Sequence, residues 1–366
     1  MIQGFLKTIG GPEVRSRLLL LYGGLIAFNV AVWGVAILVG IRYPVLLGAA
    51  ILAYGLGLRH AVDPDHIAAI DNTTRKLMQD GQRPVGVGFY FSLGHSTIVV
   101  LLSAALALST SYVRAHLPNL QATGSVIGTS ISALFLIVIG VINLVVLVDI
   151  YRQFRRVSAG EEYSDQGLNE YLNNRGLLAR LFKPALRLVD RSWKMYPVGF
   201  LFGLGFDTAS EVGLLGLSAA FGANGQLPVA MILLLPLLFT AGMSLADTTD
   251  GVLMLGAYGW AFVKPIRKLY YNLSITFISV VVALVVGGIE ALQIIGRQSG
   301  QISSQGGDTV GHGIFWSIVS ALDLQNLGFV IVAVFALSWI GSTVFYKLRG
   351  YDKLGDDENS PGVQAA

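Results

Sequence analysis

Six ionisable side chains lie close together inside a long apolar segment, in the stretch GLGLRHAVDPDHIAAIDNTT that begins at Gly55. They are Arg59, His60, Asp63, Asp65, His66 and Asp71. A charged group at the centre of a bilayer costs about 3 kcal/mol unless it is paired, ligated or faces a wet cavity. Imidazole nitrogens beside carboxylate oxygens suit Ni(II), Co(II), Zn(II) and Mn(II). The stretch therefore predicts a cation-binding site at membrane depth.

Pro64 predicts a helix break in the middle of this stretch. Proline removes the backbone hydrogen bond to the His60 carbonyl and clashes with that carbonyl. Asp63 is suited to cap a second half-helix that Pro64 opens. His60 would then end one half-helix, while Asp65 and His66 begin the next. Two imidazoles and two carboxylates converge on the break, an arrangement by which membrane transporters hold ions at the midplane.

This pattern predicts a set of metal ligands and a set of residues that either ligate the metal or support those ligands. The strongest members of the first set are His60, Asp65 and His66. Asp63 either ligates the metal or only caps the second half-helix. His95, near the middle of the third apolar segment, is expected as a further ligand or as a partner of one. Arg59 cannot ligate a cation, and we expect it to pair with a carboxylate.

Two later apolar segments also carry carboxylates at helical spacing. They are Asp207, Glu211, Asp247 and Asp250. Residues three or four apart share one face of a helix. Carboxylates in apolar helices require protons, a cation or an arginine. These four are predicted to form a second metal station, a proton relay, or a salt bridge that orients the first site.

The composition indicates an all-α integral membrane protein. The chain has 366 residues, of which 54% are hydrophobic and 13% charged, and its mean hydropathy is +0.65. The absence of cysteine excludes disulfides and thiolate ligands, and six methionines are few for a thioether Cu(I) pathway. Runs long enough to cross a bilayer predict eight transmembrane helices. They span residues 18–40, 43–72, 85–109, 126–150, 198–221, 227–262, 269–295 and 315–346.

Lysine and arginine predict how the spans are oriented. Bases gather at alternate span ends, for example Lys7, Arg75, Lys76, Lys268 and Lys347, and in the loop 152–195. Such residues favour the cytoplasmic side, so both termini are expected there. We predict one polytopic transmembrane domain over residues 1–354 and a disordered cytoplasmic tail over 355–366. Within the loop, residues 178–189 read as a helix lying on anionic lipid; the alternative is a solvated basic loop.

An inverted repeat of spans 2–4 and 5–7 is also predicted. Gly55-Leu56-Gly57 in the second span matches Gly203-Leu204-Gly205 in the fifth, with polar residues following both. The third and sixth spans share a similar pair of segments: residues 92–96 and 244–248. An offset of three spans reverses direction across the membrane, and sites in such folds lie where the repeats meet. Chance similarity between helices rich in glycine and serine is the alternative.

Four sequence blocks together resemble the nickel/cobalt transporter (NiCoT) family. The first is Arg59 to Ile67, RHAVDPDHI, in which four residues separate His60 from Asp65-His66. The others follow in the family's order: FSLGHS from Phe91, LGFDTASE from Leu204 and GMSLADTTD from Gly242. The resemblance covers nearly the whole chain and implies transport of nickel or cobalt across a membrane.

Together these observations predict a secondary permease that imports Ni(II) or Co(II), and not an enzyme. No P-loop is present, so the chain does not encode ATP hydrolysis. Export of the same metals is an alternative, since the site chemistry is the same in both directions. Membrane acyltransferase activity is a weaker one, because His60 and Asp65 fit a His-x4-Asp pattern but no phosphate-binding Gly-Thr-Arg block follows. The expected location is the inner membrane of a prokaryote. Partners are the metal ion and lipids, without nucleic acid or a resident cofactor; the oligomeric state stays open.

Overall fold

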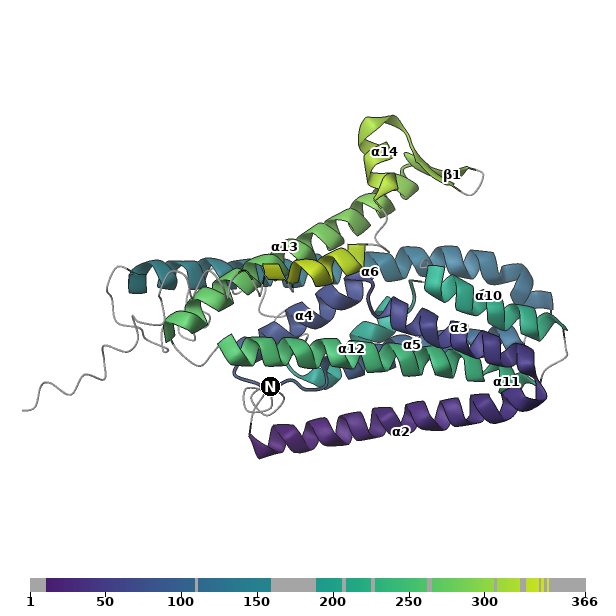
Figure 1. The fold of residues 1–366 in the computed structure, drawn as a ribbon. Coiled ribbons are helices and arrows are strands. Elements are labelled where there is room, and N and C mark those ends of the chain that lie inside the picture. The colour runs from purple at the N-terminus through teal and green to yellow at the C-terminus, as the bar shows by residue number, and fades with distance from the viewer. Residues whose placement is uncertain are drawn as a thin grey trace, which may run out of the picture.

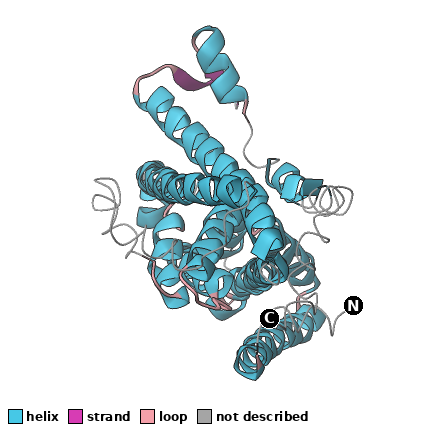
Figure 2. Cartoon of the chain, turned by 90° about the vertical axis from the view of Figure 1, so that its left-hand side faces the viewer, coloured by secondary structure: helices cyan, strands magenta, loops and turns pink. Residues whose placement is uncertain are grey.

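The computed structural model describes residues 11–338, apart from 109–110, 159–188, 206–208, 225–227, 262–264, 306–307, 323–326 and 336, together with residue 341. The loop helix predicted over 178–189 therefore lies almost wholly outside the described residues, as does the tail from 355. Within them, the protein is a bundle of helices from which one short hairpin protrudes (Figures 1 and 2). This confirms the predicted all-α membrane class.

The helices run as follows: α2 Pro12–Arg42, α3 Pro44–His60, α4 Pro64–Gln79, α5 Val87–Leu108, α6 Ser111–Ser158, α9 Met195–Phe202, α10 Ala209–Asn224, α11 Val229–Ile232, α12 Leu234–Ala261, α13 Pro265–Gln298 and α14 Gly313–Ala321. A 3-10 turn, Ser192–Lys194, precedes α9. Strands β1 Ile302–Gln305 and β2 Asp308–Gly311 pair antiparallel, with Ile302 opposite Gly311. The hairpin projects beyond the end of α13 (Figure 1).

Among the described residues, five helices are long and apolar enough to cross a membrane, or six if α3 and α4 form one bent span. The count of eight therefore remains a prediction. The fifth predicted span is divided between α9 and α10, of 8 and 16 residues. The eighth is also divided: α14 ends at Ala321, Leu322 is extended, and helix is described again from residue 327.

The break predicted at Pro64 is confirmed. Helix α3 ends at His60, α4 begins at Pro64, and the two axes differ by 51°. Asp63 occupies the N-cap position in an extended conformation, with φ −65° and ψ 143°. Its side chain makes no capping hydrogen bond. Two neighbouring side chains use the Asp63 carboxylate instead, as described below.

Helix α4 is a polar helix enclosed by protein. All its side chains from Pro64 to Met78 are buried except Asp65. Arg75 and Lys76, expected at a solvated membrane flank, are only 1% and 5% exposed. Arg75 Nη2 donates to Asn72 Oδ1 at 3.0 Å, and Lys76 Nζ donates to the Val189 carbonyl at 2.7 Å. Helices α5, α6, α12 and α13 contact α4, so these hydrogen bonds are made to protein groups at a depth where lipid could not supply them.

Helices α3 and α12 cross with their backbones in contact. A Cβ atom added at Gly57 would overlap the carbonyl of Phe239, and one added at Gly242 would lie 2.7 Å from the carbonyl oxygen of Tyr54. The glycine of each helix thus contacts an aromatic residue of the other helix. On both helices the aromatic residue lies three positions before the glycine. Small residues permit such close approach between membrane helices.

Helices α5 and α9 cross in the same reciprocal way. A Cβ atom at Gly94 would overlap the carbonyl of Tyr196, and one at Gly199 would overlap the carbonyl of Phe91. The pattern aromatic-x-x-Gly therefore occurs on all four helices. At both crossings the short helix that precedes an interruption, α3 or α9, meets the first half of a longer helix, α12 or α5.

Helix α2 lies at the edge of the bundle (Figure 1). It packs against α3 and α12 through a narrow stripe that includes Leu18, Leu25 and Val32, spaced seven residues apart. Tyr22 Oη and Thr249 Oγ1, 3.2 Å apart, add one polar contact to α12. Much of the remaining surface of α2 is exposed and apolar, as expected for a helix surrounded by lipid.

Candidate metal centre

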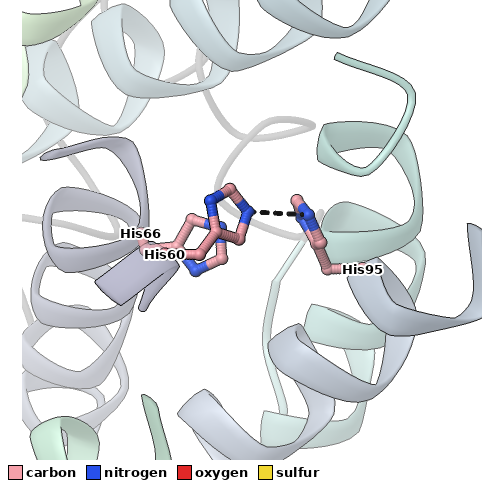
Figure 3. Close-up of side chains that lie close together, drawn as sticks. All are labelled: His60, His66 and His95. Carbon is pink, nitrogen blue, oxygen red and sulfur yellow. Dashed lines mark hydrogen bonds between the residues drawn. The ribbon is translucent and has the colours of Figure 1, made fainter. Parts of the chain in front are cut away.

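Three histidines meet in the interior of the bundle. His60 ends α3, His66 lies in the first turn of α4 and His95 lies in the middle of α5 (Figure 3). Their side chains are buried, with at most 2% exposed. One ring nitrogen from each lies within 4.8 Å of the other two. The helix break is what allows His60 and His66, from two differently directed half-helices, to approach the same point.

Glu211 joins two of these histidines from α10. His60 Nε2 and His95 Nε2 are 3.0 Å apart, and Glu211 Oε1 lies 2.8 Å from His95 Nε2 and 3.8 Å from His60 Nε2. Glu211 is 1% exposed. Two ligands about 2.1 Å from a metal and at right angles to each other are about 3.0 Å apart. The three atoms therefore have the spacing of adjacent metal ligands.

A carboxylate fixes the orientation of His60. Its Nδ1 lies 2.7 Å from Asp63 Oδ2, so this nitrogen carries the proton and Nε2 faces the other histidines. Arg59 Nη1 donates to Asp63 Oδ1 at 2.8 Å and to Ser210 Oγ at 3.0 Å. Asp63 thus links Arg59 to His60, and Arg59 pairs with a carboxylate as expected.

A second carboxylate orients His66. Both carboxylate oxygens of Asp247, on α12, lie 3.3 Å from His66 Nδ1. His66 Nε2 is buried and forms no hydrogen bond with any described residue. A proton on Nδ1, held by Asp247, leaves the lone pair of Nε2 available for a metal. Carboxylates commonly orient metal-binding histidines in this way.

Other predicted residues lie around this group without joining it. Asp65 is partly exposed and is not among the three clustered side chains, but its carboxylate acts electrostatically on His66, His95 and Asp247. Asp250 has one buried carboxylate oxygen without a hydrogen bond and is repelled by Asp247. Asp207 lies outside the described residues.

The sequence left open whether Glu211 and Asp247 belong to a second station, a proton relay or a salt bridge that orients the first site. The structure brings both to the histidines. The signal was present in the predicted repeat. A polar cluster follows the glycines of the second broken helix as it follows those of the first, and sites in such folds lie where the repeats meet. The spacing within each helix could not show which side chain of the second half reaches which histidine.

The last described helical segment covers the break. A Cβ atom added at Gly328 would overlap the carbonyl of Val62 and lie 3.5 Å from Cα of Asp63. Only glycine fits there without moving the backbone at the break. This segment and the surrounding helices bury the centre, and imidazoles and carboxylates interact more strongly inside a protein than in water.

The fold and site define a multi-pass membrane protein with a histidine–carboxylate centre at the break between α3 and α4. A family profile described as "High-affinity nickel-transport protein" matches residues 46–345. The high-affinity nickel transport protein of Cupriavidus necator is 52% identical over 349 residues, covering 95% of this chain and 96% of that protein. The chain belongs to this nickel/cobalt transporter family.

Two further relatives are similar along most of their length. Nickel transporter NixA of Staphylococcus aureus is 47% identical over 309 residues, or 84% of this chain and 88% of that protein. The cobalt transport protein NhlF of Rhodococcus rhodochrous is 39% identical over 356 residues, covering 93% of this chain and 96% of that protein. No solved structure matches the chain. Membership of a transporter family sets aside the acyltransferase alternative.

Proposed function

We propose that this chain is a secondary permease that carries Ni(II), Co(II) or both into the cell, and that the metal binds where His60, His66 and His95 meet Glu211. The observation that carries the proposal is the convergence of three buried imidazole nitrogens within 4.8 Å, with a carboxylate oxygen 2.8 Å from one of them. Three neutral nitrogens and one anionic oxygen suit late first-row divalent metals.

The hydrogen bonds within the centre support an exchange of proton for metal. His60 Nε2 and His95 Nε2 face each other at 3.0 Å, so one of them donates a proton when no metal is bound. A metal ion needs the lone pairs of both nitrogens. Binding therefore displaces the proton that lies between these two nitrogens, and its return to them favours release of the metal.

The carboxylates around the centre have different roles in this proposal. Asp63 and Asp247 hold His60 and His66 with Nδ1 protonated, and Arg59 offsets part of the negative charge. Asp65 forms no hydrogen bond with the described residues and supplies further negative charge. As the remaining predicted ligand, it would reach the metal only after a local movement. Asp207 and Asp250 keep their predicted role as a relay or second station.

The choice of metal follows from the relatives. Nitrogen and oxygen ligands alone do not separate nickel and cobalt from copper or zinc, which bind such sites at least as well. The proteins of Cupriavidus necator and Rhodococcus rhodochrous are named for nickel and cobalt transport, respectively. These names favour nickel and cobalt as the metals carried by this chain.

Import is favoured by the charge of the ion. An inside-negative membrane potential of 100 mV favours inward movement of a divalent cation by about 4.6 kcal/mol. The basic flanks predict that both termini face the cytoplasm and that the protein lies in the inner membrane of a prokaryote. The reciprocal crossings of α3 with α12 and of α9 with α5 support the predicted inverted repeat. They make Tyr54 equivalent to Tyr196 and Phe91 equivalent to Phe239. This alignment of the two halves is shifted by a few residues from the predicted one.

Uptake of radioactive nickel and cobalt by cells that express the chain tests the function. Cells with the protein should accumulate metal above the level of cells with an empty vector. Accumulation below that level, with faster loss from preloaded cells, would identify an exporter instead.

Reporter fusions test the proposed orientation. A reporter that is active only in the periplasm should be silent when fused after Gly355 and active when fused after Asn224. The opposite pattern would reverse the topology and place the basic flanks outside.

A further inference from the structure

A groove separates part of α2 from the rest of the bundle, at the end where the predicted cytoplasmic flanks lie. Its volume is about 770 Å³. Apolar side chains of two helices form its walls: Leu20, Leu21 and Phe28 from α2, and Phe89, Tyr90 and Leu93 from α5. Gly24 of α2 widens it, because nothing lies within 4 Å of a Cβ atom placed there.

One end of the groove is polar and positively charged. Arg17, Arg83, Ser192 and Trp193 line it. Neither arginine side chain forms a hydrogen bond or ion pair with any residue that the structure describes, and both are exposed. Trp193 is 53% exposed, and tryptophan is enriched at the level of the lipid headgroups. The groove therefore combines a cationic mouth with an apolar channel.

The length of the groove corresponds to one leaflet of a bilayer. Phe28 lies eleven residues after Arg17 on α2, which is about 17 Å along a helix. Half of a hydrocarbon core about 30 Å thick is about 15 Å. A lipid acyl chain with its headgroup at the arginines would thus fill the groove down to the bilayer centre.

We propose that this groove binds one anionic phospholipid of the leaflet on the side of the basic flanks. The guanidinium groups of Arg17 and Arg83 would hold the phosphate, since arginine matches phosphate geometry with paired hydrogen bonds. Basic pockets between transmembrane helices on the cytoplasmic side bind anionic headgroups in this way. A zwitterionic headgroup would bind more weakly, because its own cationic group would lie near the two arginines and repel them.

The bound lipid would also support the metal centre. Thr240 and Ser244 of α12 line the groove, and Ser244 lies one turn before Asp247, the carboxylate that orients His66. His95 lies on α5, two residues after the groove residue Leu93. Because α2 otherwise touches α12 along a narrow stripe, the lipid would hold α2 against the two helices that carry these site residues.

Native mass spectrometry of the full-length protein tests the proposal. The protein would be purified in mild detergent and given phosphatidylglycerol or phosphatidylcholine with identical acyl chains. We expect one phosphatidylglycerol to stay bound at concentrations at least tenfold below those needed for phosphatidylcholine. The double variant Arg17→Gln/Arg83→Gln should lose this tenfold preference, and Gly24→Phe, which fills the groove, should lose retention of both lipids.

Two matched variants serve as controls. Gly23→Phe places the same side chain one residue away, at an open position that does not line the groove, and Arg42→Gln removes a charge from the opposite end of α2. Both should retain phosphatidylglycerol like the wild type. Equal retention by the wild type and by Arg17→Gln/Arg83→Gln would overturn the proposal, as would equal affinity for the two lipids.

A segment of the chain itself is the competing occupant. Because the protein has no cysteine, Gly24→Cys can be paired with Leu181→Cys in the amphipathic stretch 178–189. No disulfide is expected between them in vesicles that contain phosphatidylglycerol. Its efficient formation there would show that the loop, not a lipid, fills the groove. These outcomes do not depend on metal transport.

Discussion

The two broken helices of this protein pack against their neighbours in the same way, but the halves to which they belong carry different polar side chains. In the first half, α3 and α4 with α5 contribute three nitrogens, from His60, His66 and His95. In the second half, α10 and α12 contribute oxygens, from Glu211 and Asp247. Neutral imidazoles bind a metal without adding charge, while the carboxylates offset its charge and fix the rings. In the proposed site, the first half would therefore recognise the metal, and the second half would tune how tightly it is held.

The half-helices that follow the two breaks also differ in their surroundings. Helix α4 carries polar side chains from Asp71 to Lys76 and is enclosed by protein. Helix α10 is mainly apolar and exposes Gly213 and Gly216. In Figure 1 the two extend in opposite directions from the centre of the bundle. A polar helix at membrane depth is stable only inside the protein, which explains why α4 rather than α10 is surrounded.

Removing a nitrogen from the first half should have the largest effect. We expect His66→Ala to abolish nickel uptake, because His66 supplies one of the three clustered ring nitrogens. The protein should still reach the membrane. Radioactive uptake and immunodetection of membrane fractions measure the two outcomes. His312→Ala, which removes an exposed imidazole beyond the bundle, is the matched control; wild-type uptake by His66→Ala would take this histidine out of the site.

Neutralising the second half should weaken binding without abolishing it. Glu211→Gln and Asp247→Asn keep the side-chain shape and remove the charge. Loss of a carboxylate partner typically costs about 10- to 100-fold in metal affinity. We expect Glu211→Gln to be the more severe, since Glu211 lies nearer the ring nitrogens that face each other. Calorimetric nickel titration of purified protein measures both, with Asp190→Asn, at a partly exposed aspartate paired with Lys194, as control. An unchanged affinity in Glu211→Gln would confine the site to the first half.

Acid should oppose metal binding through the nitrogens of the first half. Histidine must be neutral to ligate, and its ordinary pKa is about 6.5. Protonated rings dominate below their pKa, so affinity is greatest at higher pH and falls as the pH drops. Between pH 7.5 and 5.5, we expect affinity to fall by up to about tenfold per pH unit for each proton displaced. Calorimetry in detergent, corrected for buffer–metal complexes, measures this; a flat profile would assign binding to the carboxylates of the second half.

Equal packing of the two halves can be tested at the crossings. Gly57→Ala and Gly199→Ala each place a Cβ atom on a partner carbonyl, and we expect both to destabilise the fold by about 1–3 kcal/mol. Gly55→Ala and Gly216→Ala are matched controls at open positions, where alanine should be neutral or stabilising. Thermal unfolding in detergent compares the four. A loss at only one crossing would show that the halves are not equivalent.

The sequence by itself determined the features that depend on local geometry. Proline cannot donate a backbone hydrogen bond, so the break between His60 and Pro64 could be placed to the residue. Ionisable side chains in apolar runs marked His60, His66 and His95 as candidate ligands, and the length of the apolar runs indicated membrane helices.

Tertiary structure alone decided how residues far apart in the chain meet. Glu211 lies 116 positions from His95, and Asp247 lies 181 from His66. Whether they form a station of their own or complete the histidine group depends on how four helices cross, and that depends on the backbone contacts at their glycines. The same holds for Asp63, which orients His60 instead of capping α4, and for Arg75 and Lys76, which are buried. A helix's sequence fixes which side chains share a face, but only packing decides what that face meets.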